Sequence, residues 1–275
     1  MTRSSKLVEG KDVKVDRSPL VSLIVTYFNE DTIDKCLSTM RNQTYKNIEL
    51  VVVTDASSKK IVEVIRMYNS KLYFGGPERS IKRNLGVRKA RGFYVFIFDA
   101  DQELDTNLVE DCVREIKNYD FLAIPELPLG PDFWAKCHRF EKLAYLSGYV
   151  PVEGARFFPK RLIESVGGYD SEMVGSEDWD LTQRLLERGY KLGHSTAMLH
   201  HNDGKYNLIK TLKKKFTYGT VFRKYAKRHP KSFTAALIRP SFFRLIFKNP
   251  ILFLGSLVIR FLEGSAVLTG MVFSK

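Results

Sequence analysis

Two aspartates close an apolar run in the segment VFIFDADQEL at residues 95–104. Asp99 and Asp101 are separated by a single alanine. One aspartate of such a pair can cap a helix and the other can stand in a turn, because DADQELDTNL leads into a helical pattern. It can also belong to a calcium loop, but Leu104 stands where the tight turn of that loop needs glycine. The third interpretation is a site for Mg²⁺ or Mn²⁺, in which the ion neutralises a diphosphate.

A second acidic pair, Glu177 and Asp178, opens the segment SEDWDLTQRLLERGYKL at residues 176–192. The apolar spacing in this segment predicts an amphipathic helix. Acidic residues are favoured in the first turn of any helix, where they complement the helix dipole. A carboxylate can also accept a proton from a hydroxyl group about 3 Å away. The pair by itself leaves both interpretations open.

The elements that would position these residues alternate along the first half of the chain. Apolar, β-branched runs at 20–28, 48–56 and 93–100 predict strands that are covered on both faces. Helical patterns lie between them, at 58–69 and at 80–90 among others. Strand, helix, strand in this order predicts a mostly parallel α/β sheet.

Polar residues follow the predicted strands where the strands end. The segment Thr26–Asn29 closes the first strand, and Asp55 and Asp99 close the next two. Ligands of open α/β sheets collect beyond the carboxyl ends of the strands. The sequence therefore predicts a ligand site at this edge.

The motifs VSLIVTYFNE, NQTYKNIELVVVTDAS, RNLGVRKARGFYVFIFDAD and GGYDSEMVGSEDWDLTQRLLERGY follow one another in the chain. In this order they resemble the inverting nucleotide-sugar glycosyltransferases of family 2 over residues 20–204. The resemblance implies the GT-A fold, in which a Rossmann-like, mostly parallel sheet is flanked by helices. It also implies a UDP- or GDP-linked sugar as the donor.

The resemblance places one group of residues at the donor. Thr26 and Tyr27 match the family's nucleotide-base contact, and Asp55 matches the aspartate that binds the base ring. Thr54 departs from the aspartate that many relatives carry there. The residues expected to contact the donor are Thr26, Tyr27, Asn29, Asp55, Arg83, Asn84 and Asp99.

A second group is expected at the metal and the acceptor. Asp99 and Asp101 match the DxD motif, which implies a Mn²⁺ or Mg²⁺ cofactor, with Asp101 as the direct ligand and Asp99 nearer the ribose. His200, rather than His201, is expected to complete the metal shell. Asp178 matches the catalytic base. Glu177 and Gly154 are expected on the acceptor side.

The charge of the chain is concentrated in its tail. The formal net charge is +13, yet residues 1–204 hold 29 Lys and Arg against 30 Asp and Glu. Residues 205–248 hold 13 basic residues and no acidic one. This run, which mixes Lys and Arg with Tyr and Phe, predicts an anionic partner, either a membrane surface or a nucleic acid.

The apolar stretch at 251–273 decides between these partners. Its 23 residues are about enough to span a bilayer as a helix, and a nucleic-acid binder has no need of them. Arg260 and Glu263 interrupt it, three positions apart, and are expected to pair with each other. A core helix of the globular domain is the alternative. The preceding basic residues predict that the enzyme sits on the cytoplasmic face of the membrane.

We therefore predict a flexible segment at 1–18, a catalytic domain at 19–204 and a basic, apolar helical region at 205–275. The N-terminus has no apolar core of a secretory signal. The predicted function is metal-assisted, inverting transfer of a sugar from a nucleotide-diphosphate sugar to a hydroxyl group of a lipid-linked or membrane-proximal acceptor, such as a glycan. The alternative from another class is an inactive carbohydrate- or nucleotide-sugar-binding module. A dinucleotide-dependent oxidoreductase is disfavoured because no glycine-rich turn follows the first strand.

Overall fold

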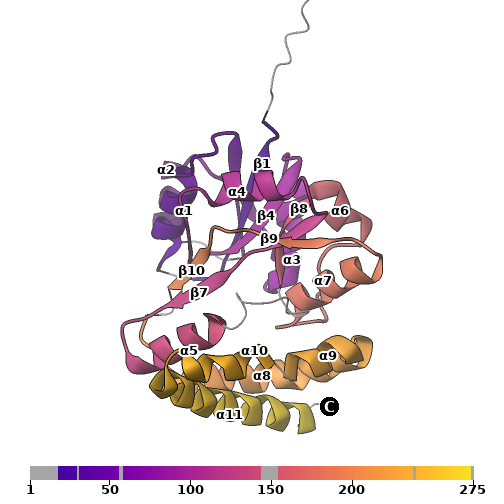
Figure 1. Ribbon diagram of the computed structural model, residues 1–275. Coiled ribbons are helices and arrows are strands. Elements are labelled where there is room, and N and C mark those ends of the chain that lie inside the picture. The colour runs from indigo at the N-terminus through magenta and orange to yellow at the C-terminus, as the bar shows by residue number, and fades with distance from the viewer. Residues whose placement is uncertain are drawn as a thin grey trace, which may run out of the picture.

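The computed structural model describes residues 18–29, 31–55, 58–143, 154–202, 204–237 and 240–273. Figure 1 shows a central sheet with helices on both faces and a separate layer of helices, formed mainly by the C-terminal part of the chain, at one end. The N-terminal segment that we predict to be flexible lies outside the described residues, apart from its last one.

The central sheet is mixed, and its longest strands are parallel. Its spatial order is β3 (Lys71–Phe74), β2 (Ile48–Thr54), β1 (Val21–Tyr27), β4 (Tyr94–Asp99), β8 (Ala155–Pro159), β6 (Phe121–Ala123) and β9 (Leu192–His194). The first four strands run parallel, and β8 runs antiparallel to both of its neighbours. The predicted α/β class, with a mostly parallel sheet, is confirmed.

A second, smaller sheet lies beside the first. Its order is β5 (Gln102–Leu104), β10 (Leu199–Asn202) and β7 (Glu126–Leu129). Residues 121–129 therefore supply two strands, β6 and β7, to two different sheets. The small sheet holds the turn after β4 in place, because β5 follows that turn directly.

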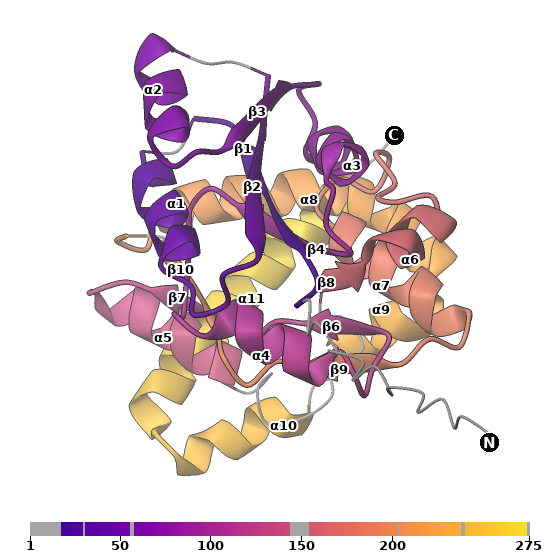
Figure 2. The same cartoon turned by 90° about the horizontal axis from the view of Figure 1, so that it is seen from above.

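Helices cover both faces of the central sheet (Figure 2). One face carries α1 (Ile33–Arg41), α2 (Lys59–Met67) and α4 (Leu108–Glu115), and the other carries α3 (Arg79–Lys89), α6 (Lys160–Ser165) and α7 (Glu177–Glu187). Alternate residues of β1 enter the two cores: Leu23 and Val25 pack towards α1, and Ile24 packs towards α3. This double burial explains why the strand is apolar at consecutive positions.

The helical layer draws on both sides of the predicted domain boundary at 204. It consists of α5 (Phe133–Leu143), α8 (Leu208–Arg228), α9 (Pro230–Leu237), α10 (Pro240–Phe243), the short 3₁₀ helix η1 (Arg244–Phe247) and α11 (Pro250–Val272). The last helix, α11, packs along α8 and α5. A Cβ atom added to Gly219 would lie 3.0 Å from the Cα of Gly270, so α8 and α11 approach closely through their glycines.

The start of α11 follows from its sequence, but the pairing of its two charges does not. The Asn249 side chain accepts a hydrogen bond from the Leu252 amide at 3.0 Å, and Pro250 occupies the first turn. The expected pair between Arg260 and Glu263 is wrong. Their partners lie on the adjacent helices, because packing against α5 and α8 offers each charge a closer partner of opposite sign.

Candidate active site

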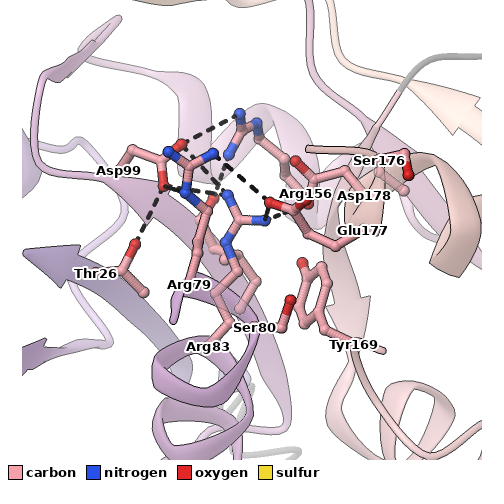
Figure 3. Close-up of polar contacts among 12 residues, drawn as sticks. Thr26, Arg79, Ser80, Arg83, Asp99, Arg156, Tyr169, Ser176, Glu177 and Asp178 are labelled. Atoms are coloured by element: carbon pink, nitrogen blue, oxygen red, sulfur yellow. Dashed lines mark hydrogen bonds and ion pairs between the residues drawn. The ribbon is translucent and has the colours of Figure 1, made fainter. Parts of the chain in front are cut away.

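The ends of β1 and β4 bring the first site residues together. Thr26 and Asp99 are paired in the sheet register, and the Thr26 hydroxyl donates a hydrogen bond to Asp99 Oδ1 at 3.1 Å (Figure 3). The backbone amide of Asp99 donates to Gln102 Oε1 at 3.0 Å. These contacts fix the Asp99 carboxylate at the carboxyl edge of the sheet.

Arg83 joins acids from two distant parts of the chain. Its side chain is fully buried. One nitrogen, Nη2, lies 3.1 Å from Asp99 Oδ1, and the other, Nη1, lies 2.5 Å from Asp178 Oδ1 and 3.3 Å from Glu177 Oε1 (Figure 3). Residues nearly one hundred positions apart therefore meet around one guanidinium group. The structure thus brings Arg83, Asp99, Glu177 and Asp178 into one cluster.

Two further arginines approach the same aspartate. Arg79 lies one turn before Arg83 on α3, with its Nε 3.8 Å from Asp99 Oδ1, and Arg156 Nη2 on β8 lies 3.8 Å from Asp99 Oδ2. Burial alone would raise the pKa of Asp99, but the charges of Arg83, Arg79 and Arg156 outweigh it and hold that pKa well below its usual range. Asp99 therefore stays ionised at any physiological pH.

The two acids that open α7 differ in exposure. The Glu177 side chain is 3% exposed, and its Oε2 has no hydrogen-bond partner among the described residues. Burial, together with the charge of Asp178, raises the pKa of Glu177. The Asp178 side chain is 21% exposed and lies against Gly154. Asp178 is thus the acid that a substrate can reach, and Glu177 packs behind it.

Asp101 has a carboxylate oxygen that the described residues leave unsatisfied. Its Oδ1 is buried without a hydrogen-bond partner there, and its Oδ2 lies 2.9 Å from His201 Nε2. Among all the residues that the structure describes, no group of three or more His, Cys, Asp or Glu side chains is arranged to hold a metal ion. A buried, unpartnered carboxylate oxygen beside an imidazole nevertheless fits a divalent cation such as Mn²⁺.

The expectation for His200 does not match this geometry. In the register of β10 with β5, His200 lies opposite Glu103 and its Nε2 contacts Asp105 Oδ1 at 2.8 Å. Neighbouring residues of a strand point to opposite faces, so His200 and His201 cannot both face Asp101. The histidine next to Asp101 is His201.

A buried lysine holds Asp55 at the carboxyl edge of the central sheet. Lys82 Nζ lies 2.6 Å from Asp55 Oδ1, donates to the Tyr27 carbonyl at 3.2 Å and stands 3.3 Å from the ring centre of Phe28. We did not identify Lys82 from the sequence. The spacing of Arg79, Lys82 and Arg83 within one helical turn was the available signal.

Two of the residues expected at the donor, Tyr27 and Asn84, make contacts within the protein, and a third, Asn29, is exposed. The Tyr27 side chain is buried in the core. Asn29 is exposed in the turn after β1. Asn84 donates to the Tyr169 carbonyl and accepts from the Tyr169 amide, both at 2.8 Å. The Asn84 amide therefore clamps the chain before α7.

The model of one protein family, described as glycosyl transferase family 2, matches residues 22–164, about half of the chain. The chain belongs to glycosyl transferase family 2. The match confirms the resemblance that we drew from the ordered motifs. It includes the strand ends with Asp99 and Asp101, and it ends before Glu177 and Asp178.

Curated relatives are similar over most of this family 2 chain. Hyaluronan synthase of Pasteurella multocida is 27% identical over 206 residues, which cover 67% of this chain and 20% of that protein. An uncharacterized glycosyltransferase of Methanocaldococcus jannaschii is 22% identical over 238 residues, which cover 78% of this chain and 82% of that protein. The chain thus spans about a fifth of the hyaluronan synthase and most of the archaeal protein.

Solved structures confirm the GT-A fold. The mannosyltransferase PcManGT from Pyrobaculum calidifontis, in complex with GDP-Man and Mn²⁺, aligns with a TM-score of 0.59 at 19% identity, covering 94% of this chain and 76% of that one. Residues 1–349 of Staphylococcus aureus TarS, in complex with UDP, align with a TM-score of 0.50 at 19% identity. The alignment covers 74% of this chain and 65% of that one. At this identity, the likeness concerns the fold.

Proposed function

We propose that the protein is an inverting glycosyltransferase that moves a sugar from a nucleoside-diphosphate donor to a hydroxyl group of a lipid-linked or membrane-proximal acceptor. The observation that carries this proposal is the position of Arg83 between Asp99, at 3.1 Å, and Asp178, at 2.5 Å. The reaction needs one acid near the donor and another near the acceptor. Here both lie within reach of a single side chain.

The donor is a UDP- or GDP-linked sugar. The nucleotide base would lie near Asp55, which Lys82 holds in place, and the ribose near Asp99, which Thr26 holds. GDP-Man in PcManGT and UDP in TarS support a nucleoside-diphosphate donor. The arginines around Asp99 add positive charge where the diphosphate would bind.

Asp101 and His201 are the proposed ligands of Mn²⁺ or Mg²⁺, and His201 replaces His200 in this role. Asp101 Oδ1 is buried without a partner among the described residues, and Asp101 Oδ2 lies 2.9 Å from His201; both support the assignment, as does the Mn²⁺ in PcManGT. When bound, the ion would neutralise the charge that develops on the leaving diphosphate. Asp99 is held by arginines and belongs nearer the ribose.

Asp178 is the proposed general base. As the acceptor hydroxyl attacks the anomeric carbon, the Asp178 carboxylate accepts its proton. Attack from the face opposite the leaving diphosphate inverts the configuration at that carbon. The contact with Arg83 orients the carboxylate, and Glu177 packs behind it on the acceptor side.

Gly154 leaves room for the base. A Cβ atom at this position would lie 2.7 Å from the Cβ of Asp178, closer than real side chains approach. We expect Gly154→Ala to lower kcat roughly 10- to 100-fold by displacing the carboxylate, with donor binding retained. Gly264→Ala is the matched control, because a Cβ there meets nothing within 4 Å. Equal activity of the two variants in a transfer assay would contradict this role.

The enzyme acts at the cytoplasmic face of the membrane in this proposal. The 13 basic residues and the absence of acidic residues between positions 205 and 248 support contact with anionic headgroups. Helix α11 is long and apolar enough to reach into a bilayer, with a mean hydropathy of 1.9 over its most apolar stretch. These features favour a membrane over a nucleic acid as the anionic partner.

A panel of nucleotide sugars tests the proposed donor. At 100 times its Kd, a donor stabilises the fold by about 2.7 kcal/mol. For a chain of this size we expect the Tm to rise by roughly 5–10 °C, for one or two donors and only with Mn²⁺ present. The readout is thermal unfolding with and without EDTA. A panel in which no nucleotide sugar shifts the Tm would overturn the proposal.

A further inference from the structure

The helices α10, η1 and α11 carry many exposed apolar side chains. The residues of this apolar face are Phe243, Ile246, Phe247, Ile251, Leu254, Leu257, Val258, Phe261, Leu268, Val272 and Phe273. Phe247 is 91% exposed and Phe261 is 73% exposed. Most of the members on α11 recur at intervals of three, four or seven residues, so they form one stripe along the helix. Soluble surfaces rarely leave such a stripe in water.

The opposite side of α11 is fixed to the rest of the molecule. Phe253 and Ile259 are buried, and a Cβ atom on Gly255 would meet the Sγ of Cys137 on α5. The Ser256 hydroxyl lies 2.8 Å from the Cys137 carbonyl. Only 22% of the most apolar stretch of α11 is buried, so α11 is not a core helix. The stripe therefore points away from the protein.

The two charges of α11 also point towards the protein. Arg260 donates to Glu141 on α5 at 2.8 Å, and Glu263 lies 2.9 Å from Lys215 on α8. Helix α8 runs beside α11 and carries basic residues in its first and last thirds. If α11 crossed a bilayer with its partners in place, the basic residues of α8 would enter the hydrocarbon, at a high cost in free energy.

Basic residues lie next to the apolar face. Arg244 and Lys248 are exposed on either side of Phe247 in the chain. No acidic residue lies between positions 205 and 248. An apolar stripe with basic neighbours matches the boundary between acyl chains and anionic headgroups.

We propose that α11 lies in the plane of an anionic lipid bilayer, with the apolar face in the headgroup–acyl boundary, and does not cross it. The partner is the bilayer itself. This inference deepens the membrane part of the proposed function, and it does not depend on which sugar is transferred.

The helical layer that would rest on the bilayer also contacts the segment before α7, which leads to the proposed base, Asp178. On α8, Arg228 lies 2.8 Å from Asp170, and a Cβ atom at Gly175 would meet the ring of Tyr218. This segment continues directly into Glu177 and Asp178. An acceptor presented at the bilayer surface would thus approach the site from the side on which the base lies.

Vesicle flotation of the full chain tests the docking. We expect the protein to float with phosphatidylcholine vesicles that contain phosphatidylglycerol, and to bind pure phosphatidylcholine at least tenfold less. Phe247→Glu and Phe261→Glu should each reduce binding at least tenfold. Phe93→Glu is the control, because Phe93, just before β4, is 59% exposed and lies outside the apolar face. Equal loss in all three variants, or a stable dimer without vesicle binding, would overturn the proposal.

A labelling experiment separates lying on the bilayer from crossing it. The three native cysteines are buried, so Lys275→Cys adds one reporter thiol, two positions after Phe273 and outside the apolar face. With protein added outside sealed vesicles, an impermeant maleimide should label this thiol equally before and after detergent. Labelling only after detergent would show that α11 spans, and would contradict the proposal. Neither experiment uses a donor sugar, so a failed transfer assay leaves both results interpretable.

Discussion

Asp178→Asn is expected to abolish sugar transfer while the variant still binds its donor. Removal of a general base typically lowers the rate 10²- to 10⁴-fold, and asparagine cannot accept the proton of the acceptor hydroxyl. The proposed nucleotide end of the site, around Asp55 and Lys82, would be unchanged by this substitution. The measurement pairs a transfer assay with isothermal titration of the donor in the presence of Mn²⁺.

Asp34→Asn is the matched control for this variant. Asp34 also lies in the first turn of a helix, α1, where it complements the helix dipole. If Asp178 acted only through the dipole of α7, the two variants would have similar activity. A wild-type protein that binds donor without transferring it would identify the chain as an inactive binding module.

Arg83→Met is expected to cause the largest loss of stability. The substitution leaves Asp99, Glu177 and Asp178 without the buried cation that they share. Removing one member of a buried ion cluster costs about 3–5 kcal/mol in the free energy of unfolding. Urea unfolding measures the difference. Lys224→Met is the control, because Lys224 and its partner Glu172 are 42% and 69% exposed and surface ion pairs contribute about 0–1 kcal/mol.

The stability difference between wild type and Arg83→Met should depend on pH. Burial raises the pKa of Asp99, but Arg83 and its neighbours lower it further, so the folded-state pKa lies below the unfolded value of about 3.9. The stabilisation is therefore complete above pH 4 and is lost as the pH falls below it. We expect the gap between the two proteins to shrink towards pH 3. A gap that stays constant from pH 7 to pH 3 would contradict this.

The location of the site could be predicted from the sequence because parallel strands end at one edge. Thr26, Asp55 and Asp99 each follow an apolar run, and the sheet register places them together. The acidic pair at Glu177 was ambiguous as a local pattern, since any helix favours acids in its first turn. The order of the motifs in the chain added the information that the spacing lacked.

Other contacts depend on tertiary pairing that no local pattern contains. The choice between His200 and His201 follows from the register of β10 against β5, two strands about one hundred residues apart. In the same way, Arg260 and Glu263 are correctly spaced to pair, but α5 and α8 supply each of them with a partner. The clamp that Asn84 makes on Tyr169 likewise arises between distant segments.

The central claim is that Asp101 and His201 hold a divalent cation close to the base, Asp178. Anomalous diffraction from crystals of the full chain, grown with Mn²⁺ and UDP or GDP, measures this directly. We predict a manganese peak in contact with the Asp101 carboxylate, His201 Nε2 and the diphosphate. A bound nucleotide with no manganese at Asp101, or manganese on residues remote from Asp178, would contradict the account.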